Sequence, residues 1–289
     1  MPLNTTVVDL WDSGFWGPVT ATLDWCEANY QFSNYVAETA NTFSNLFTMG
    51  MAIYGASQVK AASLPGRYLA GYTGFALVGL GSFIFHATLL YEAQLADELP
   101  MVYVATYCLG VLFDCAPGFS LTSTKALTLT FLYFAFNIIF TWSYAVYRNP
   151  IYHQAVFATV MLINAYRTYY LLRVSPMSAH IPAPLKTSIA RIFSSGVGIF
   201  VFGFFVWNLD NIFCGALTGW KRSLGWPAAF LLEGHSWWHI FTALGTYLMI
   251  VGNTYFTLCM KGNYKDYTLV SKYGLPQIAR SSAVKAKAL

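Results

Sequence analysis

The stretch RYLAGYTGFALVGLGSFIFHATL, residues 67–89, carries a single formal charge, on Arg67 at its start. A transmembrane helix needs about 20 mostly apolar residues to cross the hydrocarbon core of a bilayer. The stretch therefore predicts a membrane-spanning helix, and it carries His86 close to its far end. Because polar side chains are costly at membrane depth, His86 is a candidate functional residue.

The rest of the chain repeats this pattern. Of 289 residues, 56% are hydrophobic and 10% are charged, and the mean hydropathy is +0.49, which favours a multi-pass membrane protein over a soluble enzyme. The stretches long enough to span are roughly 38–57, 67–89, 98–116, 123–143, 152–172, 188–208 and 232–257. We therefore expect an all-α, seven-transmembrane helix bundle and no nucleic-acid partner.

The chain reads as one domain over residues 1–289 without an internal repeat. Its parts are an acidic N-terminal segment, 1–37, the helix bundle, 38–257, and a basic tail, 258–289. The N-terminal segment lacks the basic region and apolar run of a cleavable signal peptide, so we expect it to remain in the mature protein.

The basic residues predict an orientation. With an exoplasmic or lumenal N-terminus, twelve of the sixteen Lys and Arg residues fall on the cytosolic side, as the positive-inside rule requires. The C-terminus is then cytosolic, and its KAKAL, residues 285–289, resembles the dilysine signals that coat proteins read on cytosolic tails. We therefore expect the protein to reside in the endoplasmic reticulum membrane and to cycle through the Golgi.

Two of the five cysteines, Cys26 and Cys214, fall on the oxidising exoplasmic side in this topology. They are candidates for a disulfide, and two free buried thiols are the alternative, because the sequence does not give the Cα separation that a disulfide requires.

Three histidines fall at one depth, near the exoplasmic ends of their spans. In EGHSWWH, residues 233–239, His235 and His239 lie one helical turn apart, with Cβ atoms about 5–6 Å from each other, so both imidazoles can reach one metal ion. His86 supplies a third nitrogen from its own span. Three histidines and one open position for water describe a catalytic zinc site.

Asp97, in ADELPM at the same depth, is the candidate proton carrier, and Ser82 lies one turn before His86 on the same helical face. Ser82 could instead bond a backbone carbonyl of its own helix. The two remaining histidines, His153 and His180, read as ordinary hydrogen-bonded residues at helix ends or in a loop.

A second cluster precedes the first span in DWCEANYQFSNYVAE, residues 24–38. Asp24, Glu27, Asn29 and Glu38 offer hard oxygen ligands, which suit calcium better than zinc, although the spacing does not match an EF-hand loop. A solvated acidic segment, with Asp24 capping a helix, is the alternative.

Seven motifs, in order along nearly the whole chain, carry a resemblance to a known family. They are GFWGP (14–18), DWCEANY (24–30), AETANTFSNL (37–46), GSFIFHATL (81–89), ADELPM (96–101), NLDNIFC (208–214) and EGHSWWH (233–239). Together they resemble the alkaline ceramidases. The resemblance implies a seven-span hydrolase that cleaves the amide bond of ceramide, including dihydro- or phytoceramide, to a sphingoid base and a fatty acid.

The resemblance also implies a role for individual residues. It makes His86, His235 and His239 ligands of a catalytic zinc ion, Asp97 the proton-handling acid and Ser82 a serine beside the metal. It further implies a calcium site that modulates the enzyme. The calcium ligands would be Asp24, Trp25 through its carbonyl, Glu27, Asn29 and Glu38.

Two other classes of seven-span protein share part of this pattern. A retinal protein would need a lysine inside the seventh span, and every lysine here lies at a span end or outside the spans. A lipid receptor of the adiponectin-receptor type would hold zinc with three histidines in the same way. The acidic N-terminal segment favours the ceramidase over that receptor.

Overall fold

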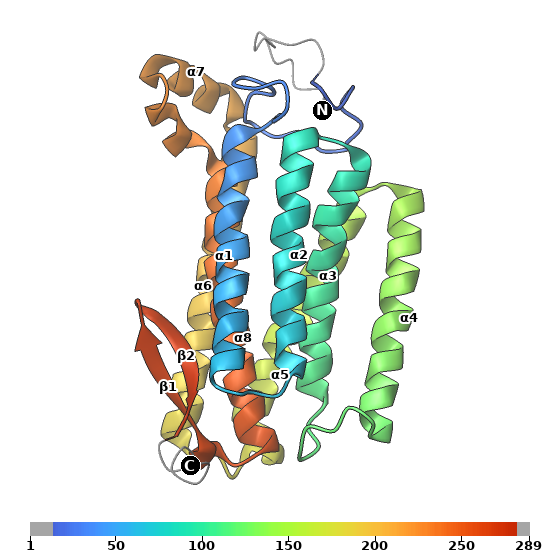
Figure 1. The fold of residues 1–289 in the computed structure, drawn as a ribbon, viewed down its shortest axis with the longest axis vertical. Helices are drawn as coiled ribbons and strands as arrows, with labels where there is room; N and C mark the ends of the chain where they lie inside the picture. Colours follow the sequence, from blue (N-terminus) through green and yellow to red (C-terminus); the bar gives the residue numbers. More distant parts are fainter. Residues whose placement is uncertain (1–13, 282–289) are drawn as a thin grey trace.

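The computed structural model describes residues 14–281. The α-helices are α1 (Thr39–Ala61), α2 (Arg67–Thr88), α3 (Tyr91–Phe113), α4 (Thr124–Tyr147), α5 (Pro150–Arg173), α6 (Ala183–Ile212), α7 (Cys214–Leu224) and α8 (Gly234–Lys261). Two strands follow, β1 (Tyr267–Lys272) and β2 (Leu275–Arg280). All helices except the short α7 run side by side as a bundle, with α7 at the end nearest the N-terminus and the strands at the other (Figure 1).

Five helices, α2, α3, α4, α6 and α8, are long and apolar enough to cross a membrane. The chain is thus a multi-pass membrane protein built on α-helices. The other two predicted spans correspond to α1 and α5, which are equally long but more polar: α1 begins TANTFSN, and α5 carries Arg167.

The start of α3 differs from the prediction of a span over 98–116. Leu89 adopts a left-handed conformation, with φ of 51°, and ends α2, after which Leu90 is extended and α3 begins at once at Tyr91. The chain therefore reverses direction within two residues. As a result Asp97 lies inside α3 and not in the loop before it.

A glycine brings α2 and α3 together at the level of Asp97. A Cβ atom added at Gly81 would lie 1.9 Å from the carbonyl oxygen of Ala96, so only glycine permits this approach. That carbonyl is free to face α2, because Pro100, four residues on, has no N–H to donate to it. The sequence signals at Gly81 and Pro100 thus bring the chain around Asp97 next to Ser82.

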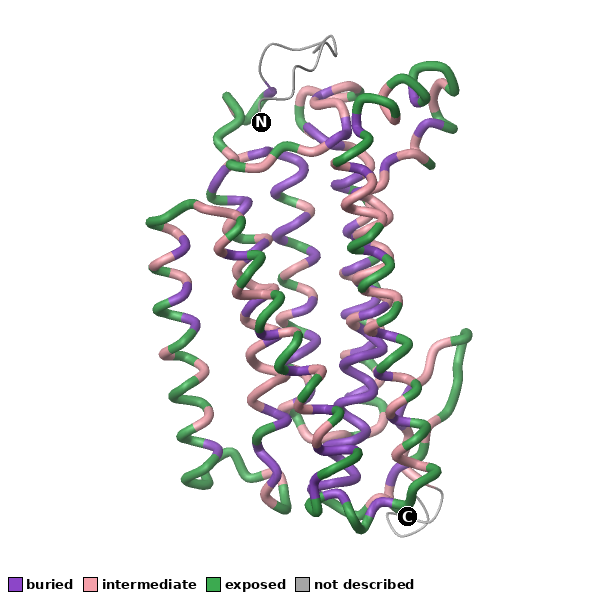
Figure 2. The backbone as a smooth tube through the Cα atoms, turned by 180° about the vertical axis from the view of Figure 1, so that it is seen from behind, coloured by how far each residue is buried: buried purple, intermediate pink, exposed green. Residues whose placement is uncertain are grey.

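Burial is greatest in α8 and least in α4. Every residue from Tyr247 to Lys261 is buried, which makes the second half of α8 the centre of the packed core (Figure 2). Large apolar side chains of α4 are exposed instead, including Phe131, Ile138 and Trp142. Because a bilayer solvates such side chains, these residues fit a lipid-facing helix.

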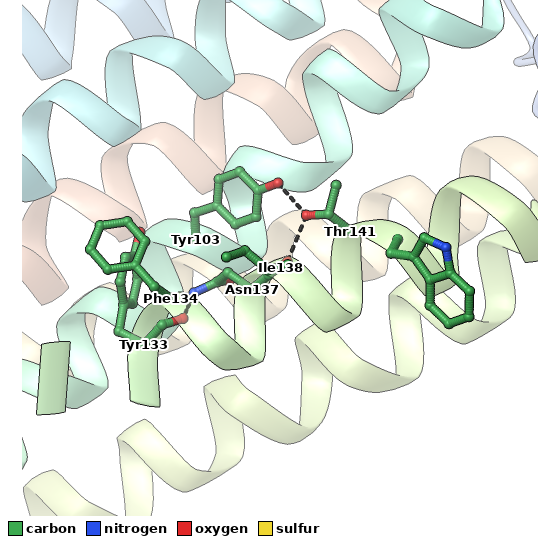
Figure 3. A pocket seen from close by; sticks show the side chains of 7 residues that line it. Tyr103, Tyr133, Phe134, Asn137, Ile138 and Thr141 are labelled. Carbon is green, nitrogen blue, oxygen red and sulfur yellow. Dashed lines mark hydrogen bonds between the residues drawn. The ribbon is translucent and has the colours of Figure 1, made fainter. Parts of the chain in front are cut away.

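A hollow of about 490 Å³ lies between α3 and α4 and is almost entirely apolar. Its few polar groups already bond to one another: the hydroxyls of Tyr103 and Thr141 lie 2.5 Å apart, and Asn137 donates to the carbonyl of Tyr133 (Figure 3). No histidine or acid lines it, so it offers space for an apolar chain and no catalytic group.

Three charged residues tie the ends of α2, α3 and α8 opposite the N-terminal segment. Asp114 Oδ2 lies 2.6 Å from Arg67 Nη1 and 2.9 Å from Lys261 Nζ, and the three side chains are nearly inaccessible to solvent. Burial alone would raise the pKa of Asp114, but the hydrogen bonds and charges of Lys261 and Arg67 outweigh it and lower that pKa. The cluster therefore stabilises the fold with Asp114 ionised.

We expect Asp114→Asn to destabilise the detergent-solubilised protein by about 3–5 kcal/mol, because it leaves two buried cations without their anion. The same reasoning predicts that wild-type stability falls with decreasing pH as Asp114 becomes protonated, since its folded pKa lies below the unfolded value. Thermal unfolding at several pH values measures both effects. Asp266→Asn, at the same end of the bundle but without an ion pair among residues 14–281, is the control. Equal stability of the two variants would contradict the prediction.

The β-hairpin and the amphipathic helix α7 were not predicted from the sequence. The hairpin occupies residues predicted as a basic tail, and its two-residue turn, Tyr273–Gly274, has positive φ at both positions, as a type I′ turn requires. Its strand β2 packs on α8, where Tyr247 donates a hydrogen bond to the Pro276 carbonyl over 2.8 Å. The KAKAL motif, residues 285–289, lies outside the residues that the structure describes.

Candidate metal site

The last turn of α2 and the first turns of α8 bring the three predicted zinc ligands together. One nitrogen from each of His86, His235 and His239 lies within 4.8 Å of the other two, and all three residues are buried. The ring centroids are 4.7–4.9 Å apart. Among residues 14–281 this is the one group of three or more His, Cys, Asp or Glu residues that is close enough to share an ion.

Helix α1 and Glu38, the residue that immediately precedes it, supply the partners of two of these imidazoles. His86 Nδ1 is in hydrogen-bond contact with Glu38 Oε2. His239 Nδ1 lies 2.7 Å from the Ser44 hydroxyl. That hydroxyl donates its proton to the Asn41 carbonyl, which leaves its oxygen as an acceptor for the ring. These partners, with the Asn45 amide nitrogen 3.3 Å from His239 Nδ1 as well, engage Nδ1 of both rings and leave Nε2 of each ring as the nitrogen available to a metal ion.

The arrangement fits a metal ion. The Nε2 atom of His86 and the Nδ1 atom of His235 are buried without a hydrogen-bond partner, which is unusual for polar atoms in a folded protein. A histidine that ligates a metal normally gives its other nitrogen to a carboxylate or another acceptor, as His86 does with Glu38. Nitrogen donors in this number suit zinc.

Ser82 and Asp97 lie next to the triad. Ser82 Oγ is 3.5 Å from His239 Nε2, and it is also a hydrogen-bonding neighbour of the Asp97 carboxyl. Asn45 of α1 donates to Ser82 Oγ over 3.0 Å. Since that bond occupies a lone pair of Ser82, its hydroxyl proton is left to point toward the carboxyl or toward a bound molecule. Asp97 is half-buried, so a ligand can reach it.

We expect Ser44→Ala to weaken zinc binding by roughly 10–100-fold, the usual effect of removing a hydrogen-bond partner of a metal ligand. Equilibrium competition with a chelator measures that affinity directly. Ser57→Ala is the matched control on the same helix, because the Ser57 hydroxyl bonds only groups of its own helix, donating to the Tyr54 carbonyl and accepting from the Gln58 amide. Equal zinc affinities of the two variants would show that Ser44 does not orient His239.

The acidic N-terminal segment docks on the start of α1. Glu27 is buried, and its two carboxylate oxygens accept hydrogen bonds from the backbone N–H groups of Ala40 and Asn41, at 2.6 and 2.8 Å. Glu27 thus caps α1, a role that was not predicted from the sequence. Burial, followed by the nearby carboxylates of Glu38 and Glu233, raises its pKa well above the usual value.

Four of the five predicted calcium ligands lie in this docked segment, and the fifth, Glu38, follows it immediately before α1. Asp24 Oδ1 accepts from the Trp25 N–H and the Asn29 amide, while Asn29 Oδ1 and Glu38 Oε1 are buried without a partner. Their carboxylates, unlike the histidines, do not form a group close enough to share one ion in the described structure. Glu38 instead contacts both the Trp25 backbone of the segment and the predicted zinc ligand His86.

The segment is held over α8 by covalent and ionic contacts. Cys26 and Cys214 form a disulfide, with Cα atoms 5.4 Å apart. Lys221 of α7 donates to the Cys26 carbonyl and pairs with Glu233 over 2.6 Å. Burial raises the pKa of Glu233 to about 7, although the Lys221 charge opposes this. These contacts fix the residues that immediately precede His235.

Asp210, at the end of α6, completes the support of α8. Its Oδ1 accepts the N–H of Gly234 at the first position of α8, over 3.0 Å.

The two other histidines lie apart from the triad, as predicted. His153 bonds the Glu98 carbonyl over 2.9 Å, and His180 bonds the Cys259 carbonyl over 3.1 Å.

Sequence reasoning missed Ser44, Asn45 and Asp210 as supports of the site. The motifs AETANTFSNL and NLDNIFC contain them, but nothing in the motifs indicates which neighbour each side chain contacts. Their spacing gave one usable signal. Glu38, Asn41 and Asn45 recur at intervals of three and four residues, which places them on one face of a helix.

The chain resembles known proteins over most of its length. The family model Ceramidase matches residues 17–279. Alkaline ceramidase 3 of Mus musculus is 36% identical over 243 residues, which cover 84% of this chain and 86% of the mouse protein. Alkaline ceramidase YPC1 of Saccharomyces cerevisiae is 33% identical over 257 residues, with 82% and 77% covered. Alkaline ceramidase of Arabidopsis thaliana is 29% identical over 249 residues, with 86% and 87% covered.

The match includes the residues that build the site. The matched range contains all three histidines, together with Ser82 and Asp97. The buried triad, its partners on α1 and the extent of the match agree with one another. The chain belongs to the alkaline ceramidase family.

Proposed function

We propose that this protein hydrolyses ceramide, releasing a sphingoid base and a free fatty acid, at a zinc ion held by His86, His235 and His239. The observation that carries the proposal is the buried triad beside Ser82 and Asp97 in a chain of this family. An amidase of this kind acts on a linear amide bond. Dihydro- and phytoceramide are included in the proposed substrate class.

When bound, zinc would polarise the ceramide carbonyl and lower the pKa of a water molecule to about 7. Asp97 accepts the proton of the attacking water and then passes it to the departing amine nitrogen. Ser82, whose lone pair is taken by Asn45, donates its hydroxyl proton toward the developing oxyanion. The aliphatic tails remain among apolar side chains, and the lipid reaches the site laterally from the bilayer.

The proposal includes a topology and a location. All seven long helices would cross the membrane, with the N-terminal segment exoplasmic or lumenal and the C-terminus cytosolic. The Cys26–Cys214 disulfide supports this, because disulfides form in oxidising compartments. The KAKAL sequence supports residence in the endoplasmic reticulum membrane, with coat-protein recognition and passage through the Golgi.

The proposal also includes calcium as a modulator, bound by Asp24, the Trp25 carbonyl, Glu27, Asn29 and Glu38. Two features support it: the unpartnered oxygens of Asn29 and Glu38, and the burial of Glu27 and Glu38 within range of each other's charge. A divalent cation would offset the repulsion between such carboxylates. Through Glu38, which contacts His86, calcium would hold the segment over the zinc site without touching the substrate.

We expect calcium chelation to lower ceramide hydrolysis several-fold while the zinc content stays unchanged, because the calcium ligands only support the site. Asp24→Ala should give the same loss and make the activity insensitive to added calcium. Hydrolysis and zinc content are measured in calcium-buffered detergent, with Asp266→Ala as the control carboxyl. Activity that does not respond to a calcium-selective chelator would rule out this role.

The direct test of the proposed function is hydrolysis of ceramide by the purified wild-type protein, followed by mass spectrometry of both products. Release of equal amounts of sphingoid base and fatty acid, together with one zinc ion per chain, is the expected result. A zinc-containing protein that binds ceramide but releases neither product would instead be a lipid receptor.

A further inference from the structure

The third zinc ligand, His235, has an aromatic partner in place of a hydrogen-bonding one. The indole of Trp25 stacks on its imidazole, with ring centroids 4.1 Å apart and planes 25° apart. Trp25 also makes an edge contact with Trp207 of α6, which in turn contacts Phe204 and Trp238. An aromatic wall from the N-terminal segment, α6 and α8 therefore stands beside the metal site.

The ring nitrogen of Trp25 is buried and has no hydrogen-bond partner. Two other indoles in the described structure use theirs: Trp16 donates to the Tyr35 carbonyl over 2.8 Å, and Trp237 donates to the Leu231 carbonyl over 3.1 Å. A buried N–H without an acceptor is rare in folded proteins because it forfeits its hydrogen bond to water. The Trp25 N–H therefore indicates an acceptor that binds beside His235.

The kind of acceptor follows from chemistry. The unpartnered nitrogens of His86 and His235 can use a lone pair to hold a cation, but an indole nitrogen only donates. Trp25 therefore needs an oxygen. Ceramide offers its amide carbonyl, which the proposed mechanism directs to the metal and Ser82, and the hydroxyl oxygens of its sphingoid base. The hydroxyls remain as acceptors.

We propose that the Trp25 Nε1–H donates a hydrogen bond to a hydroxyl oxygen of the sphingoid base, and that Trp25 is thereby a specificity-determining residue. This proposal rests on the proposed function, since it needs ceramide to occupy the site. It is separate from calcium binding, which would use the Trp25 backbone carbonyl and not its side chain. The aromatic wall formed with Trp207 gives the adjoining aliphatic part of the base an apolar surface.

The first experiment changes the N–H and the hydroxyl in turn. Trp25→Phe keeps an aromatic ring over His235 and keeps the backbone carbonyl, but it has no N–H. Wild type and variant are compared on N-hexanoyl ceramide and on analogues that lack the hydroxyl at C1 or at C3. We expect wild type to prefer ceramide over one analogue by roughly tenfold in kcat/KM, and Trp25→Phe to lose that preference.

The proposal would be overturned if Trp25→Phe lost kcat/KM equally on all three substrates, or if it lost none. The second result would mean that a water molecule, and not the substrate, accepts from the indole N–H. These outcomes differ from failure of the proposed function, in which wild type hydrolyses none of the three. If Trp25→Phe does not fold, the wild-type comparison decides alone. Equal kcat/KM values of wild type on ceramide and both analogues would then refute the hydrogen bond.

A second experiment does not depend on turnover. In an Asp97→Asn background, which keeps every zinc ligand, the Kd of N-hexanoyl ceramide is measured with and without Trp25→Phe. We expect Trp25→Phe to raise that Kd about tenfold. The Kd of the analogue that lacks the hydroxyl recognised by wild type should stay unchanged. Zinc content should not fall, because the substitution keeps every zinc ligand and an aromatic ring over His235.

Trp237→Phe is the matched control. It also removes an indole N–H near the start of α8, but one whose partner is the Leu231 carbonyl of the protein itself. We expect it to keep the wild-type preference among the three substrates. The same shift in preference for Trp237→Phe as for Trp25→Phe would show that the effect does not arise from the Trp25 N–H.

Discussion

Purified His235→Ala protein is expected to lose its zinc and, with it, ceramide hydrolysis. Removal of this ligand leaves only two nitrogens, and residues 14–281 offer no further His, Cys, Asp or Glu residue in the group to replace it. The fall in zinc affinity should exceed the roughly 10–100-fold expected when only a partner of a ligand is lost, as in Ser44→Ala. Metal analysis and product analysis on the same sample measure both effects.

His180→Ala is the control for this variant. It makes the same truncation at a histidine whose ring bonds the Cys259 carbonyl, at the opposite end of α8 from the triad. It should keep its zinc and its activity, apart from a small loss of stability. If His235→Ala retained one zinc ion per chain and wild-type turnover, zinc catalysis by the triad would be wrong.

The height of each histidine along its helix was readable from the sequence, and it was enough to predict that the three would come together. An apolar stretch of fixed length gives each histidine a height along its helix, and His86, His235 and His239 came out at the same height. The motif resemblance pointed to the same residues. The boundary of α3 was read less well, because hydropathy detects where apolar residues begin, whereas the helix begins seven residues earlier, at Tyr91.

The sequence did not predict how α1 is rotated about its axis. Ser44 and Asn45 are small polar residues near the start of a helix, where such side chains often bond only their own backbone. Whether they reach His239 and Ser82 depends on which face α1 turns toward α2 and α8, and packing across the bundle decides that. The same holds for Trp25, whose stacking on His235 joins segments about two hundred residues apart in the chain.

The β-hairpin could not be predicted from the sequence for a different reason. The strand β1 reads YTLVSK, with four of its six residues at least partly polar or small, and no alternation marks it against a polar tail. What holds it is contact with the bundle, including the bond from Tyr247 to Pro276 and the bond from Gln277 to the Tyr54 hydroxyl over 3.2 Å. Local propensity was too weak to predict an element that tertiary contacts stabilise.

Asp97→Asn is expected to lower kcat by roughly 10²–10⁴-fold, the usual contribution of a positioned proton carrier. The amide has nearly the shape of the carboxyl and keeps a hydrogen-bonding contact with Ser82, but it cannot accept a proton from water and pass it to the amine. Zinc content and the Kd of ceramide should stay close to wild type. That separation distinguishes a catalytic residue from one that holds the metal.

Glu92→Gln tests whether the effect belongs to Asp97 or to any acid on this helix. Glu92 lies in the first turn of α3 and is exposed, so its amide should leave kcat, zinc content and ceramide affinity unchanged. Loss of zinc from Asp97→Asn would make Asp97 a structural support of the site. Full activity of Asp97→Asn would instead mean that another group carries the proton, and Ser82, within hydrogen-bonding reach of His239, is the side chain to examine next by Ser82→Ala.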